Sequence, residues 1–383
     1  MTSVRILHII VGLEAGGAEL MMSRLIDRNH GRAELEHRVI SLTDIGPIGK
    51  ELQLFGVTVY ALGIRGVRGL PLGFWRLVRT IREERPDVVQ TWMYHADFLG
   101  GLAAFVNRRR IVWGVRATDV KSEGVRKTVW LRRLCAVLSH WLPDKIICAA
   151  EASRRAHIDI GYDPSRMIVI PNGFDVPTLA DTATNRASAR ARFGIAANEL
   201  VVGTVGRFNP VKDYATFVEA AALIVRVLPQ ARFLMVGRGL DVDNPELMRW
   251  IRRAGITERT ILLGERTDVL RCLAVMDVFC LSSRNEGFPN VVGEAMSAGL
   301  SCVVTDVGDA ALLVGETGIV VPCANPSRLA SGVLSLLHLA PQQRLDWGIA
   351  ARRRIESHFT IEAVRIEYAD IYRALSSDAR RLD

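Results

Sequence analysis

The feature that most constrains the fold is an alternation of short apolar runs with helical stretches, which occurs twice along the chain. In the first half, the runs that predict strands are residues 5–11, 37–42, 57–62, 87–91, 110–115, 145–148 and 167–170. Several are apolar throughout, as expected for strands that helices cover on both faces. Helical stretches such as residues 18–28 and 73–84 fall between them. The alternation therefore predicts a parallel sheet with right-handed crossovers.

Residues 171–198 interrupt this pattern, because they are rich in Pro, Asn, Asp, Ala and Thr and contain no strong strand. We interpret them as a linker followed by a short helix. The alternation then restarts, with strands predicted at residues 200–205, 232–236, 260–263, 278–281, 302–305 and 318–321. Helices are predicted at residues 213–227, 245–254, 291–298, 327–338, 341–357 and 361–375.

Two such series predict an α/β protein of two Rossmann-like, doubly wound domains, and 383 residues suit two domains. Ligands of open α/β sheets bind at the carboxyl ends of the strands, so we expect the domains to face each other across a cleft. The predicted domains are residues 1–175 and 199–360, with the linker and short helix at 176–198. Residues 361–383 should form a helix that packs back on the first domain.

The positive charge is concentrated in the first half. Residues 1–175 hold 25 Lys and Arg against 18 Asp and Glu, whereas the remainder holds 24 against 23. This asymmetry indicates an anionic partner: phospholipid, a phosphorylated acceptor or nucleic acid. Residues 125–142 combine Arg126, Lys127, Arg132 and Arg133 with Trp130 and Trp141. They predict either a helix that docks on an anionic membrane or a buried helix with a solvated basic side. No nucleic-acid-binding motif accompanies the charge, so nucleic acid is disfavoured.

The cysteines and the N-terminus indicate the compartment. Six cysteines, at positions 135, 148, 272, 280, 302 and 323, show no CxxC spacing, which is typical of buried free thiols in a reducing cytoplasm. The N-terminal MTSVRILHIIVG predicts a first strand rather than a signal peptide. No run reaches the ~18–20 apolar residues of a membrane span. We therefore expect a cytoplasmic protein, peripheral at the inner face of the plasma membrane if the basic helix docks there.

Three turns that follow predicted strands carry candidate binding residues. The first strand leads into Gly12-Leu13-Glu14-Ala15-Gly16-Gly17, where backbone N–H groups and a helix N-terminus can approach an anion; packing alone is the alternative. Residues 200–205 lead into a loop with Arg207 and Lys212, two cations that suit a diphosphate unless they are only solvated loop charges.

The third turn follows residues 278–281 and reads Ser282-Ser283-Arg284-Asn285-Glu286-Gly287-Phe288-Pro289-Asn290, before a helix from Val291 that carries Glu294. The amides of Gly287 and Phe288, with Asn290 and Val291 at the helix start, can take phosphate. Glu286 can accept hydrogen bonds from sugar hydroxyls and Glu294 from a ribose, because carboxylates are bidentate acceptors. Both glutamates could instead be surface charges or caps.

These motifs carry a family resemblance. Glu286 and Glu294 form E-x7-E within SRNEGFPNVVGEAMSAGLSCVVTDVG, and GRFNPVKD, IPNGFD and GGAE stand in matching order. The chain thus resembles the retaining family 4 glycosyltransferases of the GT-B fold. The resemblance implies that Arg207 and Lys212 hold the donor diphosphate, Glu286 the transferred sugar and Glu294 the ribose. It implies that Gly16 and Gly17 bring backbone to the phosphate or sugar, and that Arg266, in Gly264-Glu265-Arg266-Thr267-Asp268, lies by the nucleobase.

Two positions depart from the family pattern. A histidine often follows the strand at residues 87–91 near the reacting sugar, but Trp92 stands there, and His95 is the candidate to take over that role or to cap a helix. The usual glutamate after residues 301–305 is Asp309, which puts donor contacts there in doubt. Asp241 and Asp243 form a DxD in a polar loop, but two acids in a loop are commonplace, so we predict no metal site.

The sequence therefore predicts a metal-independent, retaining hexosyltransferase without a cofactor, which uses a UDP-sugar or alternatively a GDP-sugar. The acceptor would be a glycan or lipid-linked hydroxyl compound in cell-surface polysaccharide, lipopolysaccharide or glycolipid biosynthesis. The alternatives are a nucleotide-sugar epimerase of the same fold and a non-catalytic nucleotide-sugar-binding protein. The sequence leaves open the nucleobase, the sugar, the acceptor, the linkage and the oligomeric state.

Overall fold

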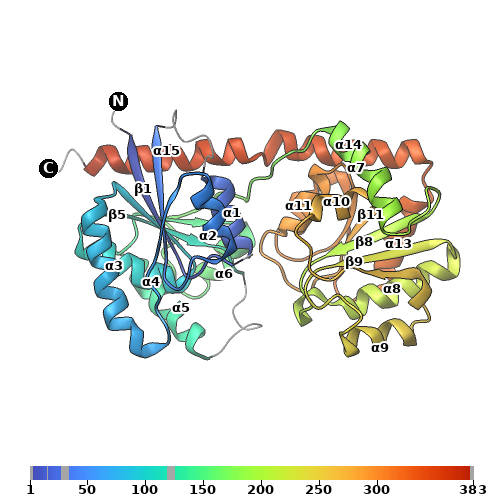
Figure 1. Ribbon diagram of the computed structural model, residues 1–383, viewed down its shortest axis with the longest axis horizontal. Coiled ribbons are helices and arrows are strands. Elements are labelled where there is room, and N and C mark those ends of the chain that lie inside the picture. Colours follow the sequence, from blue (N-terminus) through green and yellow to red (C-terminus); the bar gives the residue numbers. More distant parts are fainter. Residues whose placement is uncertain (1–2, 15, 27–33, 119–125, 380–383) are drawn as a thin grey trace. The chain divides into compact units, whose positions relative to one another are not determined.

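A computed structural model describes residues 3–14, 16–26, 34–118 and 126–379. The chain forms two compact units: unit 1 is Met1–Gly173 with Ile361–Asp383, and unit 2 is Phe174–Thr360. Each unit holds one sheet with helices packed against it (Figure 1). Every predicted strand range overlaps one observed strand, which confirms the α/β prediction.

Unit 1 contains a seven-stranded sheet in the order β3-β2-β1-β4-β5-β6-β7, and all neighbouring strands are parallel. Its strands are β1 (Val4–Ile10), β2 (Leu35–Ser41), β3 (Thr58–Ala61), β4 (Val88–Trp92), β5 (Arg110–Val115), β6 (Lys145–Cys148) and β7 (Met167–Val169). The strand order reverses between β1 and β4. Their carboxyl ends therefore flank the switch point at which doubly wound sheets bind ligands.

Helices cover both faces of this sheet. The core on one face includes side chains of α3 (Leu70–Glu84), α4 (Tyr94–Val106) and α5 (Arg126–Leu138). The core on the other face includes side chains of α1 (Gly17–Leu25), α2 (Gly46–Leu54) and α15 (Ile361–Ala379). The short α6 (Glu151–Ile158) follows β6. The Tyr372 hydroxyl donates to Gln90 Oε1 at 3.2 Å and ties α15 to β4, so the last helix is an integral part of unit 1.

Unit 2 contains a six-stranded parallel sheet in the order β10-β9-β8-β11-β12-β13. Its strands are β8 (Leu200–Val205), β9 (Ala231–Val236), β10 (Thr260–Leu262), β11 (Val278–Leu281), β12 (Ser301–Thr305) and β13 (Gly318–Val321). The main helices are α7 (Leu179–Arg192), α8 (Tyr214–Val227), α9 (Pro245–Arg253), α10 (Val269–Ala274), α11 (Asn290–Ser297), α12 (Ala310–Val314), α13 (Pro326–Leu337) and α14 (Pro341–His358). The order reverses between β8 and β11, so the loops that follow these two strands meet at the switch point.

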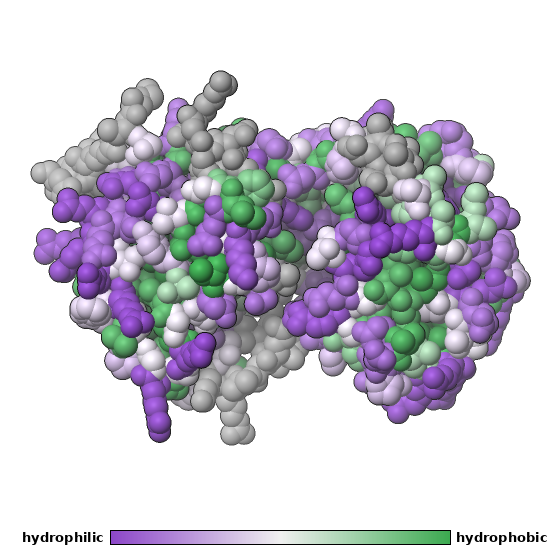
Figure 2. Space-filling view, viewed as in Figure 1, coloured by the Kyte–Doolittle hydropathy of each residue, from purple (hydrophilic) through white to green (hydrophobic). Residues whose placement is uncertain are grey.

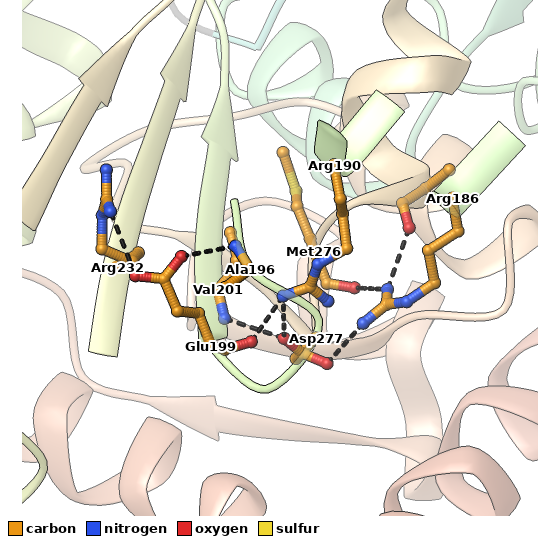
Figure 3. A network of polar contacts seen from close by, with 9 residues as sticks. Arg186, Arg190, Ala196, Glu199, Val201, Arg232, Met276 and Asp277 are labelled. Atoms are coloured by element: carbon orange, nitrogen blue, oxygen red, sulfur yellow. Dashed lines mark hydrogen bonds and ion pairs between the residues drawn. The ribbon is translucent and has the colours of Figure 1, made fainter. Parts of the chain in front are cut away.

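The helix α7 is fastened to the amino ends of β8 and β11 by a polar network (Figure 3). Arg186 donates to the carbonyls of Ala274 and Met276 at 2.9 and 2.7 Å and pairs with Asp277 at 2.7 Å. Asp277 Oδ2 in turn accepts from the backbone N–H of Val201 at 2.8 Å. The helix within residues 176–198 is therefore built into unit 2, because its arginines satisfy buried strand-end groups of that sheet.

The cysteines are free thiols, and Cys135, Cys148, Cys272, Cys280 and Cys302 are buried as expected. Cys323, which follows β13, is exposed, so the expectation of buried thiols is wrong at this position. Burial raises the pKa of the Cys272 thiol to about 11 and that of Cys148 to about 12. These two thiols are protonated at neutral pH and packed as small apolar side chains.

Candidate functional site

The first candidate loop connects β8 to α8. Arg207 is exposed near its start, and Asn209 Oδ1 accepts from Val211 N–H at 2.9 Å to shape the short 3-10 turn Pro210–Lys212. Asp213 then takes a left-handed conformation, with φ 49°. Its carboxylate accepts from the Thr216 hydroxyl at 2.7 Å and caps α8. The loop therefore presents Arg207 and Lys212 from a fixed backbone at the switch point of unit 2.

The second candidate loop connects β11 to α11 and contacts the first. Ser282 Oγ donates to the Lys212 carbonyl at 2.8 Å, and the backbone N–H of Arg284 donates to the Val211 carbonyl at 2.7 Å. Arg284 also pairs with Asp213 at 2.7 Å. The order of the strands places the two loops beside each other, and these bonds lock them into one surface.

At the centre of this surface, Lys212 Nζ lies 2.6 Å from Glu286 Oε1. The Ser283 hydroxyl donates to the same oxygen at 2.6 Å. The two charged side chains are only 24% and 12% exposed. Lys212 is less exposed than Arg207, because it is drawn to the carboxylate of the neighbouring loop.

The remaining residues of the second loop lie where the motif predicted. Pro289 is the N-cap of α11, whose first two residues are Asn290 and Val291. Glu294 lies further along the same helix and is half-buried. Glu286 thus precedes the helix and Glu294 lies within it, so the two carboxylates are separated along its axis.

Two aromatic contacts hold the second loop against the rest of unit 2. Phe288 stacks on Phe174 with ring centroids 6.1 Å apart and also packs on Phe359 at 5.7 Å. Gly293 makes room for the ring, because a Cβ at that position would lie 2.0 Å from Phe174 Cζ. Phe288 is buried, so only its backbone remains a candidate for contact with a ligand.

The loop between β12 and α12 closes the site. Gly308 has φ +55°, and a Cβ there would lie 2.2 Å from the Glu286 carbonyl oxygen. The backbone N–H of Asp309 donates to the Gly287 carbonyl at 2.9 Å. Asp309 is buried and stands at the N-cap of α12. Asp309 therefore supports the loop that holds Glu286, and any contact of its side chain with the donor stays a prediction.

Arg266 lies in the turn after β10, as predicted, but its guanidinium is engaged. It donates to both carboxylate oxygens of Asp268 at 2.8 and 2.7 Å. This fork lowers the pKa of Asp268 and raises that of Arg266. A nucleobase would therefore meet the edge or face of a preformed Arg266–Asp268 pair, and a role for Arg266 stays a prediction.

In unit 1, Gly16 is the N-cap of α1, and Gly17 is its first residue. Ala15, between them and Glu14, lies outside the described residues. A Cβ at Gly16 would lie 2.2 Å from Glu19 Oε2, so this carboxylate folds back over the turn. An anion can reach these amides only after Glu19 moves, because the carboxylate already occupies the positive end of the helix.

Trp92 and His95 lie in different environments. Trp92 is buried and its Nε1 donates to His8 Nδ1 at 3.2 Å, so neutral His8 carries its proton on Nε2 and donates to His37 Nδ1 at 2.9 Å. Burial lowers the pKa of His8, which favours this neutral form. His95 is exposed in the first turn of α4, and partial desolvation lowers its pKa. Of Trp92 and His95, only His95 is exposed, and its role toward a ligand stays a prediction.

Met93, between them, has φ 71° and ψ 161°, a region that is essentially restricted to glycine. Its N–H donates to the Gly114 carbonyl at 2.9 Å, and its carbonyl accepts from Asp97 N–H at 2.8 Å. These bonds hold the strained turn that directs the start of α4. Such strain is concentrated at functional sites, which supports the carboxyl end of β4 as one.

Sequence reasoning missed three residues, Ser282, Ser283 and Arg116. Ser282 and Ser283 follow a buried strand directly, and two hydroxyls at such a position are a signal for bonds that fix the loop. Arg116 follows β5 and places its guanidinium 4.8 Å from the Trp92 ring centroid, where it donates to Asn172 and Tyr368. Its position at a strand end was the available signal.

The DxD loop follows β9. The backbone N–H of Asp243 donates to Asp241 Oδ1 at 3.2 Å, which is an ordinary turn contact. In the described part of the chain, no three His, Cys, Asp or Glu side chains gather in a group that could hold a metal ion.

Solved structures define the class by its fold. The Anabaena protein HepE, solved in complex with UDP, superposes with a TM-score of 0.84 at 24% identity and covers 97% of this chain and 100% of its own. Sucrose-phosphate synthase from Thermosynechococcus elongatus gives a TM-score of 0.78 at 17% identity and covers 98% and 100%. At these identities the likeness establishes the GT-B fold.

The family follows from the sequence comparisons. A family model described as Glycosyltransferase Family 4 matches residues 15–177, and one described as Glycosyl transferases group 1 matches residues 199–338. The chain belongs to this glycosyltransferase family, which confirms the resemblance.

Individual relatives match over part of the chain. The Escherichia coli UDP-Gal:alpha-D-GlcNAc-diphosphoundecaprenol alpha-1,3-galactosyltransferase is 30% identical over 240 residues, which is 60% of each chain. A Bacillus subtilis protein named as a glycosyltransferase, EpsF, is 28% identical over 316 residues, or 79% of each. The chain thus spans less than two thirds of the length of the first of these relatives.

Proposed function

We propose that this protein transfers a hexose-type sugar from a nucleoside-diphosphate sugar to a hydroxyl acceptor. The observation that carries the proposal is the pair formed by Lys212 and Glu286, 2.6 Å apart at the switch point of unit 2. In this pair, a cation that would suit a diphosphate lies beside a carboxylate that would suit sugar hydroxyls. Arg207, exposed on the same loop as Lys212, supplies a second cation with a planar fork.

The chemistry requires stabilisation of the departing diphosphate. Negative charge grows on the leaving oxygen as the bond to the anomeric carbon breaks, and prearranged cations stabilise that charge without reorganisation. Arg207 and Lys212 would do this without a metal or cofactor, while Glu286 holds the sugar and Glu294 the ribose. We further propose retention at the anomeric carbon by a front-face route, in which the leaving phosphate helps to deprotonate the acceptor. This step rests on the family resemblance.

The donor that we favour is a UDP-sugar, with a GDP-sugar as the alternative. HepE was solved with UDP and with UDP-glucose, and the Escherichia coli relative is named for UDP-Gal. That relative is also named for a lipid diphosphate acceptor. We accordingly propose a lipid-linked or glycan acceptor, in the assembly of cell-surface polysaccharide, lipopolysaccharide or glycolipid.

We also propose that α5 brings the protein to the inner face of the plasma membrane. Trp130, Leu134, Val137 and Trp141 are exposed at spacings of four, three and four residues, so they form one stripe on the helix and its end. Trp130 is 72% and Trp141 62% exposed. The helix thus turns apolar as well as basic side chains to solvent, which supports membrane docking over a buried helix with a solvated basic side.

The charge beside the stripe suits anionic lipid. Arg133 is exposed next to it, whereas the side chains of Arg126 and Lys127 lie outside the described part of the chain. Hydrophobic patches interrupt the hydrophilic surface of unit 1 in Figure 2. Among the described helices none is long and apolar enough to cross a bilayer. Aromatic side chains beside arginines are typical of helices that lie in the membrane interface.

The test of the proposed activity is turnover. The purified protein is incubated with UDP-glucose, UDP-galactose, UDP-N-acetylglucosamine and GDP-mannose, with and without EDTA, and release of the nucleoside diphosphate is measured. We expect slow hydrolysis of one UDP-sugar that excess EDTA leaves unchanged, and retention in the product by NMR. Donor binding without any turnover would instead identify a binding protein, and loss of activity on chelation would bring Asp241 and Asp243 back into consideration.

A further inference from the structure

Three consecutive residues that the proposed chemistry does not use, Ser282, Ser283 and Arg284, connect the two loops of the site. Ser282 and Arg284 hold the backbone of the β8–α8 loop through the carbonyls of Lys212 and Val211, as described above. Ser283 is different, because its hydroxyl donates to a side chain, that of Glu286, and not to the backbone of the β8–α8 loop.

The Ser283 bond is firmly placed. Ser283 is fully buried, so its hydroxyl has no access to water as an alternative partner. Its carbonyl accepts from Thr305 Oγ1 at 2.7 Å, which ties the residue to β12. In the structure this buried hydroxyl donates to Glu286 Oε1. It therefore fixes the carboxylate of Glu286 rather than following it.

The consequence for Glu286 is that its two oxygens become unequal. Oε1 receives both Lys212 Nζ and Ser283 Oγ at 2.6 Å. No hydrogen bond from the described residues reaches Oε2. The carboxylate thus has one oxygen held by the protein and one that remains able to accept from a ligand.

Lys212 alone could not maintain this arrangement during the reaction. Its ammonium group sits on a flexible stem and is the proposed ligand of the donor diphosphate, so donor binding competes for it. If Lys212 turns toward the phosphate, the Ser283 bond still holds Oε1. Glu286 then keeps its orientation at the moment when the sugar needs it.

We propose that Ser283 is a positioning residue that keeps Glu286 Oε2 directed at the transferred sugar while Lys212 serves the diphosphate. This inference rests on the proposed function. It assigns Ser283 an effect on the sugar part of the donor and none on the nucleoside diphosphate.

The experiment compares Ser283→Ala with Ser297→Ala. Ser297 is an equally buried serine of α11 whose hydroxyl donates to the Gly293 carbonyl at 2.7 Å, so its loss is a matched structural control. Binding of UDP and of UDP-glucose is measured by calorimetry, and kcat and KM by UDP release. We expect Ser283→Ala to lower kcat by about 5- to 30-fold, as for the loss of one hydrogen bond, with UDP affinity unchanged within about twofold. Ser297→Ala should leave both unchanged.

A double-mutant comparison separates positioning from general damage. In a Glu286→Gln background, Ser283→Ala should have little further effect, because its only target is already altered. Ser283→Cys keeps the size with a weak donor and should fall between Ser and Ala, which covers the case of poor folding by the alanine variant. Equal weakening of UDP and UDP-glucose, or full additivity with Glu286→Gln, would overturn the proposal.

Different results would contradict the proposed function and the proposed role of Ser283. If the wild-type protein binds UDP-sugars without turnover, the proposed function fails, but the assignment of Ser283 still predicts that Ser283→Ala weakens UDP-glucose and not UDP. If turnover is present and Ser283→Ala behaves like Ser297→Ala, the positioning role fails while the function stands.

Discussion

Lys212 Nζ and Glu286 Oε1 lie 2.6 Å apart although 74 residues separate them in the sequence. The cation proposed for the diphosphate and the carboxylate proposed for the sugar therefore form one ion pair. The diphosphate of a donor would therefore bind next to this pair, and its charge would act on both residues. The residues proposed for the phosphate part and the sugar part of the donor are thus coupled by one contact.

The first prediction concerns the two cations. Arg207→Ala and Lys212→Ala should each lower kcat/KM by ~10–150-fold, since hydrogen bonds to charged groups are worth ~1.5–3 kcal/mol. Their effects on stability should differ. Arg207 is exposed, so its loss should leave the urea midpoint unchanged, whereas Lys212→Ala removes the counter-charge of a carboxylate that is only 12% exposed. We expect a loss of about 1 kcal/mol for Lys212→Ala. Normal kinetics in both variants would refute the site.

The second prediction concerns the strain at Met93. With φ 71° and ψ 161°, this residue occupies a region that glycine reaches freely and alanine does not. Met93→Gly and Met93→Ala both delete the side chain, but only glycine relieves the strain. The glycine variant should be more stable than the alanine variant by about 1 kcal/mol in denaturant unfolding, the reverse of the usual order. The usual order, alanine above glycine, would show that the turn is unstrained.

The third prediction concerns pH. Asp97 is buried, accepts from Thr91 Oγ1 at 2.6 Å through one oxygen and has no hydrogen-bond partner among the described residues at the other. Burial raises its pKa to about 7. An unfolded Asp titrates near pH ~3.9, so this group favours folding below about pH 4, and that stability is lost as pH rises to about 7.

Asp97→Asn removes this titration. We expect the free energy of unfolding of the variant, relative to wild type, to improve by about 2–4 kcal/mol between pH 4 and pH 8. Burial lowers the pKa of His157 to about 4, which gives the opposite slope, but His157 is present in both proteins and cancels. Urea unfolding at the two pH values measures the difference. Parallel curves would mean that Asp97 titrates normally.

The fourth prediction concerns the membrane. The protein should co-sediment with vesicles of phosphatidylglycerol and phosphatidylcholine and be released as salt rises, because surface attraction is screened over ~8–10 Å at 0.10–0.15 M salt. Trp130→Ser with Trp141→Ser should weaken binding at every salt concentration, since each exposed indole loses its place in the interface. Replacement of Arg126, Lys127, Arg132 and Arg133 by Gln should abolish the salt-dependent part of vesicle binding. Val227→Ser, an exposed apolar position of unit 2, is the control. Equal binding to neutral vesicles would contradict the role of charge.

The sheets and the loops of the site could be predicted because they depend on local pattern and a general rule. Apolar runs bounded by turns indicated every strand, and parallel sheets bring the carboxyl ends of adjacent strands together. Arg207, Glu286 and Glu294 were placed correctly on their elements for that reason.

The side-chain pairing could not be predicted. Whether Lys212 reaches Glu286 or extends into solvent depends on rotamers and on the twist between two loops, neither of which is encoded in local sequence. The same holds for the face that α5 turns to water, because this helix carries apolar side chains on both faces, with Cys135, Ala136 and Leu138 buried but Trp130, Leu134 and Val137 exposed. The direction of the Ser283 hydroxyl is likewise a tertiary property.

The fifth prediction separates the two glutamates. Glu286 precedes α11 and is paired with Lys212, and Glu294 lies within the helix, so they should meet different parts of one donor. Glu286→Gln keeps the shape but replaces one acceptor oxygen by a donor. If its hydrogen bonds strengthen as charge builds at the anomeric carbon, kcat should fall more than donor affinity. Glu294→Gln should weaken free UDP and UDP-sugar alike, by about tenfold for one hydrogen bond of ~1.4 kcal/mol.

Calorimetry with UDP and UDP-glucose on both variants decides the assignment. For Glu286→Gln, UDP affinity should stay within about twofold of wild type, because a nucleoside diphosphate carries no hexose for Glu286 to read. Lys212, released from part of its pairing, would if anything bind the diphosphate more readily, so a small gain in UDP affinity also agrees with the geometry. If Glu286→Gln weakens UDP as much as Glu294→Gln does, Glu286 does not contact the sugar, and the order of the two carboxylates along the donor is wrong.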